Sequence, residues 1–251
     1  MNRMSRLSRR ILRSIPLEIA DIHLVHRSRR WEFDELLLKS RNALDDAASV
    51  QNFESVSADG KSLMDFMRLY VIWSCIRDSF STGGHSAEVG AYQGGTSKFI
   101  DSAMTYFAGG HRGIHHVLDT FEGHPDRIQP EYDSIHKEGM LSETSHDEVS
   151  AYLGDRDGVN VIQGIFPDSA TSIEDLSFSF VHLDTDIYSG TLDGLSYFVP
   201  RMLRGGTIVV DDFGARKCPG VGDTRFGAGV TLRPCFSDGS GTVEVSRMIW
   251  V

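Results

Sequence analysis

The chain has 251 residues, of which 40% are hydrophobic, enough for one α/β domain with a sizeable core. Its formal net charge of −10 is unevenly distributed, because residues 1–30 hold eight arginines and only two acidic residues, Glu18 and Asp21. Residues 31–251 therefore have 16 more acidic than basic side chains, which argues against an enzyme that acts on nucleic acids.

The basic N-terminal arm allows two interpretations. Its arginines could bind an anionic membrane surface, but we favour a solvated helix or tail that packs on a partner subunit. The arginines concerned are Arg3, Arg6, Arg9, Arg10 and Arg13. No uninterrupted apolar segment follows them, as a secretory signal would require, and no run of 18 apolar residues predicts a membrane span. We expect a cytoplasmic protein that forms a homo-oligomer.

The three cysteines do not indicate a disulfide scaffold or a zinc site. Cys75, Cys218 and Cys235 lack the spacing of metal ligands and leave one thiol unpaired. Cys75 lies within an apolar helical pattern, so we expect it in the core.

Helical patterns precede the first strand. Residues 31–54 and 60–80 have helix-like spacing, for example Leu63, Phe66, Met67 and Tyr70 at intervals of three and four. These helices could cover a substrate site. We expect residues 1–54 to form a basic arm with helices, and residues 55–251 to form the main domain.

Five short apolar runs then predict strands, with helical segments between most of them. They are His85–Val89, Ile114–Leu118, Val159–Ile162, Phe178–Leu183 and Thr207–Val210. The last segment, Thr231–Val251, has a glycine-containing turn and is expected to form a hairpin. The order predicts an α/β fold with a Rossmann-like doubly wound sheet. That sheet would be mostly parallel with a C-terminal antiparallel hairpin, plus the N-terminal helices.

A long excursion separates the second and third strands. Ser145 and Glu148 form the pattern of a capping box, which predicts a helix from there through Tyr152. Residues from about 122 to 145 would lie over the crevice at the end of the sheet, so we expect a lid that spans about 122–155.

Two acidic clusters each follow a predicted strand. Asp184 and Asp186 follow the fourth strand, and Asp211 and Asp212 follow the fifth. Because side chains beyond the carboxyl ends of parallel strands share one crevice, these four carboxylates should meet. Such a cluster requires either bound protons or a divalent cation with oxygen ligands.

The first predicted strand leads into the glycine loop Gly90-Ala91-Tyr92-Gln93-Gly94-Gly95. Its spacing differs from the dinucleotide fingerprint, and it lacks the lysine of a phosphate-binding loop. An acid at the second strand end, Asp119, could accept both hydroxyls of a ribose. A nucleoside without phosphates is therefore favoured, and S-adenosylmethionine has the cationic groups that suit an acidic site.

Five segments resemble the macrocin O-methyltransferase (TylF-type) family in order and spacing, over roughly residues 55–226. The segments are Glu88–Ser97, Leu118–Pro125, Gln163–Asp168, Leu183–Tyr188 and Gly205–Phe213. The resemblance implies a class I methyltransferase that uses S-adenosylmethionine and magnesium to methylate a hydroxyl. The implied acceptor is a hydroxylated, glycosidic small molecule, typically a sugar of a natural product.

The resemblance also implies roles for individual residues. Asp184, Asp211 and Asp212 would bind Mg²⁺, with Mn²⁺ or Ca²⁺ as alternatives, and Asp186 would be the general base. Asp119 would bind the ribose, and residues 163–166 would lie near the adenine. The full set expected to bind the cofactor is Glu88, Gly90, Tyr92, Gly94, Thr96, Ser97, Asp119, Thr120, Gln163, Gly164, Phe166 and Asp184.

Other interpretations remain open from the sequence. Asp186 and the pair Asp211-Asp212 could cap neighbouring segments, and Asp119 could be a turn residue. His124 or His146 could replace Asp186 as the base. A non-catalytic protein that binds S-adenosylmethionine, or a nucleotide-dependent oxidoreductase, are the alternative functions.

Overall fold

The computed structural model describes residues 47–79, 83–108, 113–154, 156–212, 217–221 and 247–250. The chain divides into two compact units, Met1–Ala47 and Ala48–Val251, and the described residues belong almost entirely to the second. The predicted basic arm and the first part of the predicted helix over 31–54 lie outside the described residues. Among the helices that are described, none is long and apolar enough to cross a membrane.

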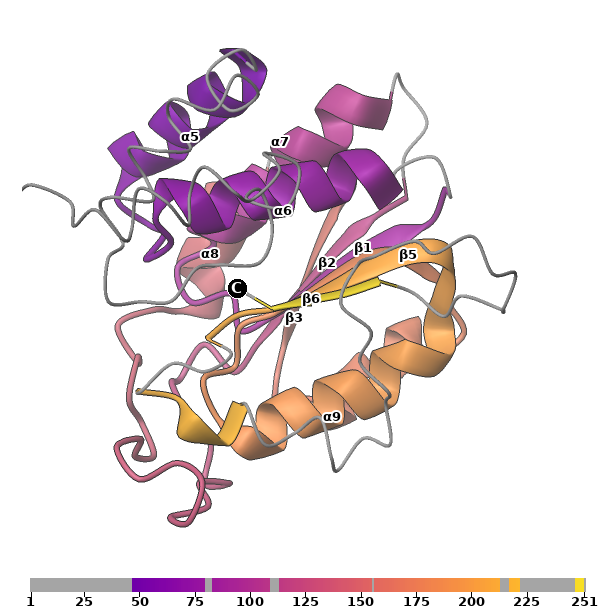
Figure 1. Ribbon diagram of the computed structural model, residues 1–251. Helices are drawn as coiled ribbons and strands as arrows, with labels where there is room; N and C mark the ends of the chain where they lie inside the picture. The colour runs from indigo at the N-terminus through magenta and orange to yellow at the C-terminus, as the bar shows by residue number, and fades with distance from the viewer. Residues whose placement is uncertain are drawn as a thin grey trace, which may run out of the picture. The chain divides into compact units, whose positions relative to one another are not determined.

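Six described strands form one sheet in the order β3-β2-β1-β4-β5-β6, and every pairing in it is parallel (Figure 1). The strands are β1 (His85–Val89), β2 (His115–Asp119), β3 (Val159–Gln163), β4 (Phe178–Leu183), β5 (Met202–Val210) and β6 (Arg247–Trp250). The five predicted strands are confirmed, although β5 begins five residues before the predicted start. The strand order reverses between β1 and β4, which is where doubly wound sheets bind ligands.

The predicted C-terminal antiparallel hairpin is not present among the described strands. β6 pairs with β5 in parallel, from Thr207 opposite Arg247 to Val210 opposite Trp250. A parallel neighbour requires a crossover of a dozen or more residues, and the segment 211–246 is long enough to provide one. The rest of the expected hairpin, residues 231–246, lies outside the described part of the chain.

Helices cover both faces of the sheet, so the central strands are buried on both sides (Figure 1). In one hydrophobic core, α6 and α7 pack against Phe180 of β4 and Val209 of β5. In another, α9 packs against Val181 and Leu183 of β4. The helices are α5 (Ala47–Asp59), α6 (Phe66–Ser79), α7 (Gly95–Ala108), α8 (His146–Leu153) and α9 (Tyr188–Phe198), with the short 3-10 helices η3 (Asp168–Ile173) and η4 (Val199–Arg201).

Capping residues explain where three of the helices begin or end, and two of these boundaries differ from the prediction. α5 continues past residue 54 to Asp59 and is followed by Gly60 at φ 66°. α6 begins at Phe66 rather than 60, because the Asp65 side chain accepts a hydrogen bond of 3.0 Å from the Arg68 amide. The predicted start of α8 is confirmed, since Ser145 Oγ accepts a hydrogen bond from the Glu148 amide.

The excursion over residues 122–145 is held against α9. The Asp133 side chain is buried and accepts a 2.9 Å hydrogen bond from the Tyr188 amide at the start of this helix. Arg127 forms an ion pair of 2.8 Å with Asp193 of α9, and Tyr132 stacks on Tyr188. The excursion therefore lies beside the start of α9, the helix that follows β4.

Candidate active site at the carboxyl edge of the sheet

The ends of β1 and β4 approach each other closely at the point where the strand order reverses. A Cβ atom at Gly90, whose φ is 88°, would lie 1.9 Å from the carbonyl oxygen of Asp184. Only glycine permits this approach and this backbone conformation. The glycine loop and the first acidic cluster are thus parts of the same site.

The acidic residues that follow β4 and β5 lie close together, as predicted. Carboxylate oxygens of Asp184, Asp211 and Asp212 lie within 4.8 Å of one another. Asp211 is 2% exposed, and its Oδ1 has no hydrogen-bond partner among the residues that the structure describes. A buried oxygen without a partner is costly unless a ligand satisfies it. This donor set of hard oxygens suits a divalent cation such as Mg²⁺.

The electrostatics of the cluster oppose full ionisation. Burial, together with Asp211 and Asp186, raises the pKa of Asp184 well above its usual range. Burial and the hydrogen bond with Asp212 raise the pKa of Asp186 to about 7. The pKa of Asp211 is raised by burial in spite of the opposing effect of Arg68. The cluster therefore requires bound protons or a cation in addition to Arg68, as the sequence analysis predicted.

The capping interpretation of Asp186 is wrong. The N-cap of α9 is Ile187, no side-chain hydrogen bond caps it, and Asp133 instead accepts the Tyr188 amide. Asp186 and Asp212 both have a left-handed backbone, with φ of 60° and 58°. Such conformations in non-glycine residues are found preferentially at functional sites, and aspartate tolerates them better than most residues.

Arg68 contributes a positive charge that no sequence motif indicated. Its Nη1 donates to Oδ2 of Asp211 in a short ion pair, and its Nη2 donates to the Leu63 carbonyl at 3.1 Å. Burial alone would lower the pKa of Arg68, but Asp211 and Asp184 outweigh it and raise that pKa. The guanidinium is therefore charged and compensates part of the cluster.

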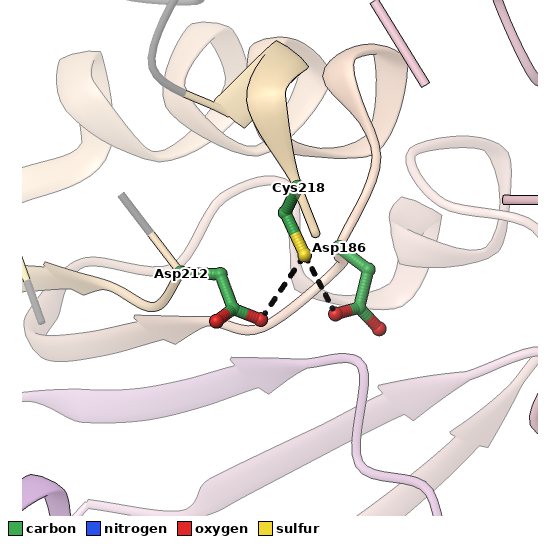
Figure 2. Close-up of side chains that lie close together, drawn as sticks. All are labelled: Asp186, Asp212 and Cys218. Carbon is green, nitrogen blue, oxygen red and sulfur yellow. Dashed lines mark hydrogen bonds between the residues drawn. The ribbon is translucent and has the colours of Figure 1, made fainter. Parts of the chain in front are cut away.

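Cys218 is a second residue of the site that sequence reasoning missed. Its thiol, which has a single proton to donate, lies 3.5 Å from Oδ1 of Asp186 and 3.3 Å from Oδ2 of Asp212, within hydrogen-bond distance of both (Figure 2). Burial and these carboxylates raise the pKa of the thiol, so it stays protonated. Cys218 thus connects the predicted base with a predicted metal ligand. Cys75, in contrast, lies in the core as predicted.

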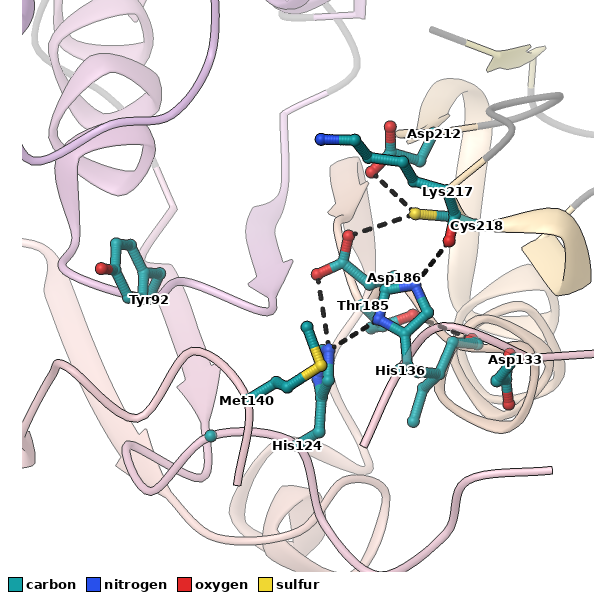
Figure 3. A network of polar contacts seen from close by, with 12 residues as sticks. Tyr92, His124, Asp133, His136, Met140, Thr185, Asp186, Asp212, Lys217 and Cys218 are labelled. Carbon is teal, nitrogen blue, oxygen red and sulfur yellow. Dashed lines mark hydrogen bonds and ion pairs between the residues drawn. The ribbon is translucent and has the colours of Figure 1, made fainter. Parts of the chain in front are cut away.

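Two histidines of the excursion approach Asp186 (Figure 3). His136 Nε2 must donate to the Lys217 carbonyl at 2.8 Å, so in the neutral ring its Nδ1 accepts from His124 Nε2 at 3.1 Å. The same His124 Nε2 is 3.9 Å from Oδ2 of Asp186. Burial and His136 lower the pKa of His124 to about 4. A proton already on Nε2 and this low pKa make His124 a weaker base than Asp186.

His146, the other alternative base, contacts Asp147, Ser150 and the ring of Phe121. None of the described contacts of His146 involves the acidic cluster.

The predicted cofactor residues Thr96 and Ser97 at the start of α7 form side-chain hydrogen bonds within the protein. Glu88 is 0% exposed, accepts from Ser97 Oγ in a short hydrogen bond, and pairs with His182 Nδ1 at 2.9 Å. Thr96 Oγ1 is 2.9 Å from Ser62 Oγ. Glu88 of β1 therefore connects the start of α7 with β4.

Asp119 connects the loops after β1 and β2. Its Oδ2 accepts from the Tyr92 amide and its Oδ1 from the Phe121 amide, both at 2.8 Å. Burial raises its pKa in spite of these hydrogen bonds. Asp119 thus has the structural role of a turn residue, and its position between Tyr92 and Thr120 is also the one expected for a ribose ligand.

The residues expected near the adenine are divided between surface and core. Gln163 Nε2 donates to the Thr120 carbonyl at 3.3 Å, and the Gly164 amide donates to the Asp119 carbonyl at 2.9 Å. Phe166 is 8% exposed and stacks on Phe198, so it packs mainly in the core. Gly94 of the glycine loop lies against side chains of α8.

The parallel sheet, the glycine loop after β1 and the acid after β2 together are features of a doubly wound α/β fold that binds a nucleoside at the carboxyl ends of its strands. The sequence matches the model of the family described as Macrocin-O-methyltransferase (TylF) over residues 37–226, well over half of the chain. The protein therefore belongs to the macrocin O-methyltransferase (TylF) family of S-adenosylmethionine-dependent O-methyltransferases.

Two relatives come from species of Streptomyces. The 8-demethyl-8-(2,3-dimethoxy-alpha-L-rhamnosyl)-tetracenomycin-C 4'-O-methyltransferase of Streptomyces olivaceus is 26% identical over 195 residues, which are 72% of this chain and 73% of the relative. The demethyldecarbamoylnovobiocin O-methyltransferase of Streptomyces niveus is 24% identical over 173 residues, 64% of this chain and 65% of the relative.

Two solved structures have the same fold. The O-methyltransferase NovP has a TM-score of 0.60 and 22% identity, with 69% of this chain and 76% of that chain covered. The calicheamicin methyltransferase CalS11 has a TM-score of 0.57 and 14% identity, with 77% and 89% covered.

Proposed function

We propose that this protein transfers a methyl group from S-adenosylmethionine to a hydroxyl of a sugar on a small natural product, in a reaction that depends on Mg²⁺. The observation on which this rests is the group Asp184, Asp211 and Asp212 beside Asp186, at the point where the glycine loop approaches β4. Mn²⁺ and Ca²⁺ are the alternative ions for the same oxygen ligands. A rhamnosyl group appears in the name of the Streptomyces olivaceus relative, so deoxysugar glycosides are the first acceptors to test.

Asp184, Asp211 and Asp212 would hold the ion, and the unpartnered Oδ1 of Asp211 is the oxygen that most requires it. When bound, the ion would act as a Lewis acid that makes the acceptor hydroxyl easier to deprotonate. The chain would supply the orientation, because methyl transfer needs the hydroxyl oxygen in line with the methyl carbon and the departing sulfur.

Asp186 would accept the hydroxyl proton as the oxygen forms its bond to the methyl carbon and the carbon–sulfur bond breaks. A pKa of about 7, raised by burial and Asp212, suits a base near neutral pH. The Cys218 thiol would fix the orientation of this carboxylate through Oδ1, leaving Oδ2 for the acceptor. The proton of His124 Nε2 is directed to His136, which favours Asp186 over His124 as the base.

The domain limits remain part of this proposal. Residues 1–54 would form the basic arm with helices, and residues 55–251 the methyltransferase domain with a lid over about 122–155. The attachment of Asp133 to the α9 N-terminus and of Thr144 to the Tyr92 carbonyl supports a lid that is anchored at both of its sides. A homo-oligomer is also proposed, and sedimentation of the full chain tests it.

The function is tested by separating cofactor binding, ion binding and turnover. Calorimetry with S-adenosylhomocysteine and with MgCl₂ would be combined with methyl transfer from radiolabelled S-adenosylmethionine to a panel of rhamnosides and other deoxysugar glycosides. We expect Asp184→Ala to lose Mg²⁺ binding and keep cofactor binding. We expect Asp186→Asn to keep both and to lose turnover by about 10²-fold or more.

Asp78→Asn is the matched control, because it removes an exposed carboxylate at the end of α6, outside the cluster. Full turnover in Asp186→Asn would exclude this residue as the base. Cofactor binding without turnover on any acceptor would favour the non-catalytic alternative, and preferential binding of a dinucleotide would favour an oxidoreductase.

A further inference from the structure

Arg68 and the proposed metal site share one carboxylate. Arg68 Nη1 bonds to Oδ2 of Asp211, whereas Oδ1 of the same side chain has no partner among the described residues. Asp211 has only 1% of its side chain exposed and Arg68 only 17%, so water competes little for this contact. The two oxygens of Asp211 thus have different surroundings, one bonded to a fixed cation and one open to a ligand.

Arg68 is held in place by residues that directly precede α6. Nη2 of Arg68 donates to the Leu63 carbonyl at 3.1 Å, and the Arg68 amide donates to Asp65 Oδ1 at 3.0 Å. Arg68 is therefore fixed at both the backbone and the end of its side chain. Because Nη2 is bonded to the Leu63 carbonyl, Nη1 is the guanidinium nitrogen that bonds to Asp211, at Oδ2.

We propose that Arg68 is a positioning residue that makes the site select Mg²⁺ over Ca²⁺, because it leaves Asp211 only one oxygen with which to bind an ion. This inference rests on the proposed metal site. Mg²⁺ needs six ligands in a compact octahedron and keeps several waters, so one oxygen of Asp211 is sufficient for it. Ca²⁺ takes six to eight oxygens and commonly uses both oxygens of a carboxylate, so it loses a ligand when Oδ2 is occupied.

The positive charge of Arg68 has a separate effect on both ions. It repels any divalent cation in the cluster and so reduces the affinity for Mg²⁺ and Ca²⁺ together. The ratio of the two affinities therefore isolates the effect on ligand number from the effect of charge. Loss of Arg68 should tighten the binding of both ions and should favour Ca²⁺ more than Mg²⁺.

The test is calorimetric titration of the full chain, saturated with S-adenosylhomocysteine, with MgCl₂ and separately with CaCl₂. In Arg68→Met, we expect the ratio of the Ca²⁺ to the Mg²⁺ dissociation constant to fall about tenfold, the change that one added charged contact gives. In Arg68→Lys, an ammonium still occupies Oδ2, so the ratio should stay close to that of the unmodified protein. If Arg68→Met does not fold, Arg68→Gln removes the same charge with a smaller change in shape.

Arg156→Met is the matched control, because Arg156 also pairs with a buried carboxylate, Asp101, at 2.6 Å. It removes the same charge and a similar ion pair outside the cluster, so its ratio should be unchanged. An unchanged ratio in both Arg68→Met and Arg68→Gln, with Mg²⁺ still bound, would overturn the inference about Arg68 alone. Absence of binding of either ion to the unmodified protein would instead refute the proposed metal site, and with it this inference.

Discussion

Replacement of Gly90 by alanine should test the close approach that forms the site. The new Cβ would lie 1.9 Å from the Asp184 carbonyl oxygen and 2.7 Å from its carbonyl carbon, distances that no Cβ atom can keep. The ends of β1 and β4 would have to separate, and the φ of 88° adds a cost of about 1–2 kcal/mol for a residue with a side chain. With about 1–3 kcal/mol for overpacking, the free energy of unfolding should fall by about 2–5 kcal/mol.

Gly60→Ala provides the control for the backbone term. Gly60 has φ 66°, and no atom lies within 4 Å of the position that a Cβ would take, so only the conformational cost applies there. The two variants would be compared by urea denaturation and by calorimetry with S-adenosylhomocysteine. Gly90→Ala should lose stability beyond Gly60→Ala and should also lose cofactor affinity. Equal losses of stability in the two variants would refute the argument from the approach of β1 to β4.

Two further predictions concern Cys218 and the buried His116. Cys218→Ala removes the donor between Asp186 and Asp212, so we expect about 1 kcal/mol lower stability and a lower kcat with little change in KM. Cys218→Ser should restore part of the turnover, and an alanine variant with full kcat would contradict the orienting role. Burial lowers the pKa of His116 to about 4, so between pH 6.5 and 4 the unfolded chain binds more protons than the folded protein. Stability should therefore be complete above pH 6.5 and fall by about 3 kcal/mol toward pH 4, a slope that His116→Gln should reduce in denaturation measured across this range.

The sequence was sufficient to predict the central strands because their residues are buried on both faces. The bounds of β1 and β4 agree with the prediction to the residue. The early start of β5 at Met202 was not predictable, since Arg204, Gly205 and Gly206 interrupt the apolar pattern. The parallel direction of β6 depends on pairing with β5 across a long connection, and no local pattern encodes that direction.

The sequence predicted those residues of the candidate site that directly follow strands, because the topology of the sheet determines where they lie. Acids that follow neighbouring parallel strands must meet, which explains the success with Asp184 and Asp211. Arg68 is 143 positions from Asp211 in the sequence, so no local spacing connects them. A weak indication existed, because Arg68 lies on the same helical face as the buried Ile72 and Cys75, where a charge needs a partner. Cys218 lies beyond the end of β5 and gave no comparable indication.

Charge compensation is unequal across the cluster, and this inequality separates the proposed roles of its carboxylates. Arg68 is among the main influences on the pKa values of Asp184 and Asp211 and opposes the rise in both. The main influences on Asp186 are instead burial, Asp212 and Cys218, and its pKa is raised to about 7. A carboxylate near a fixed cation is favoured as an anionic ligand, whereas one without such a cation can take up a proton near neutral pH. The ion pair of Arg68 with Asp211 thus favours Asp211 as an ion ligand and Asp186 as the proton acceptor.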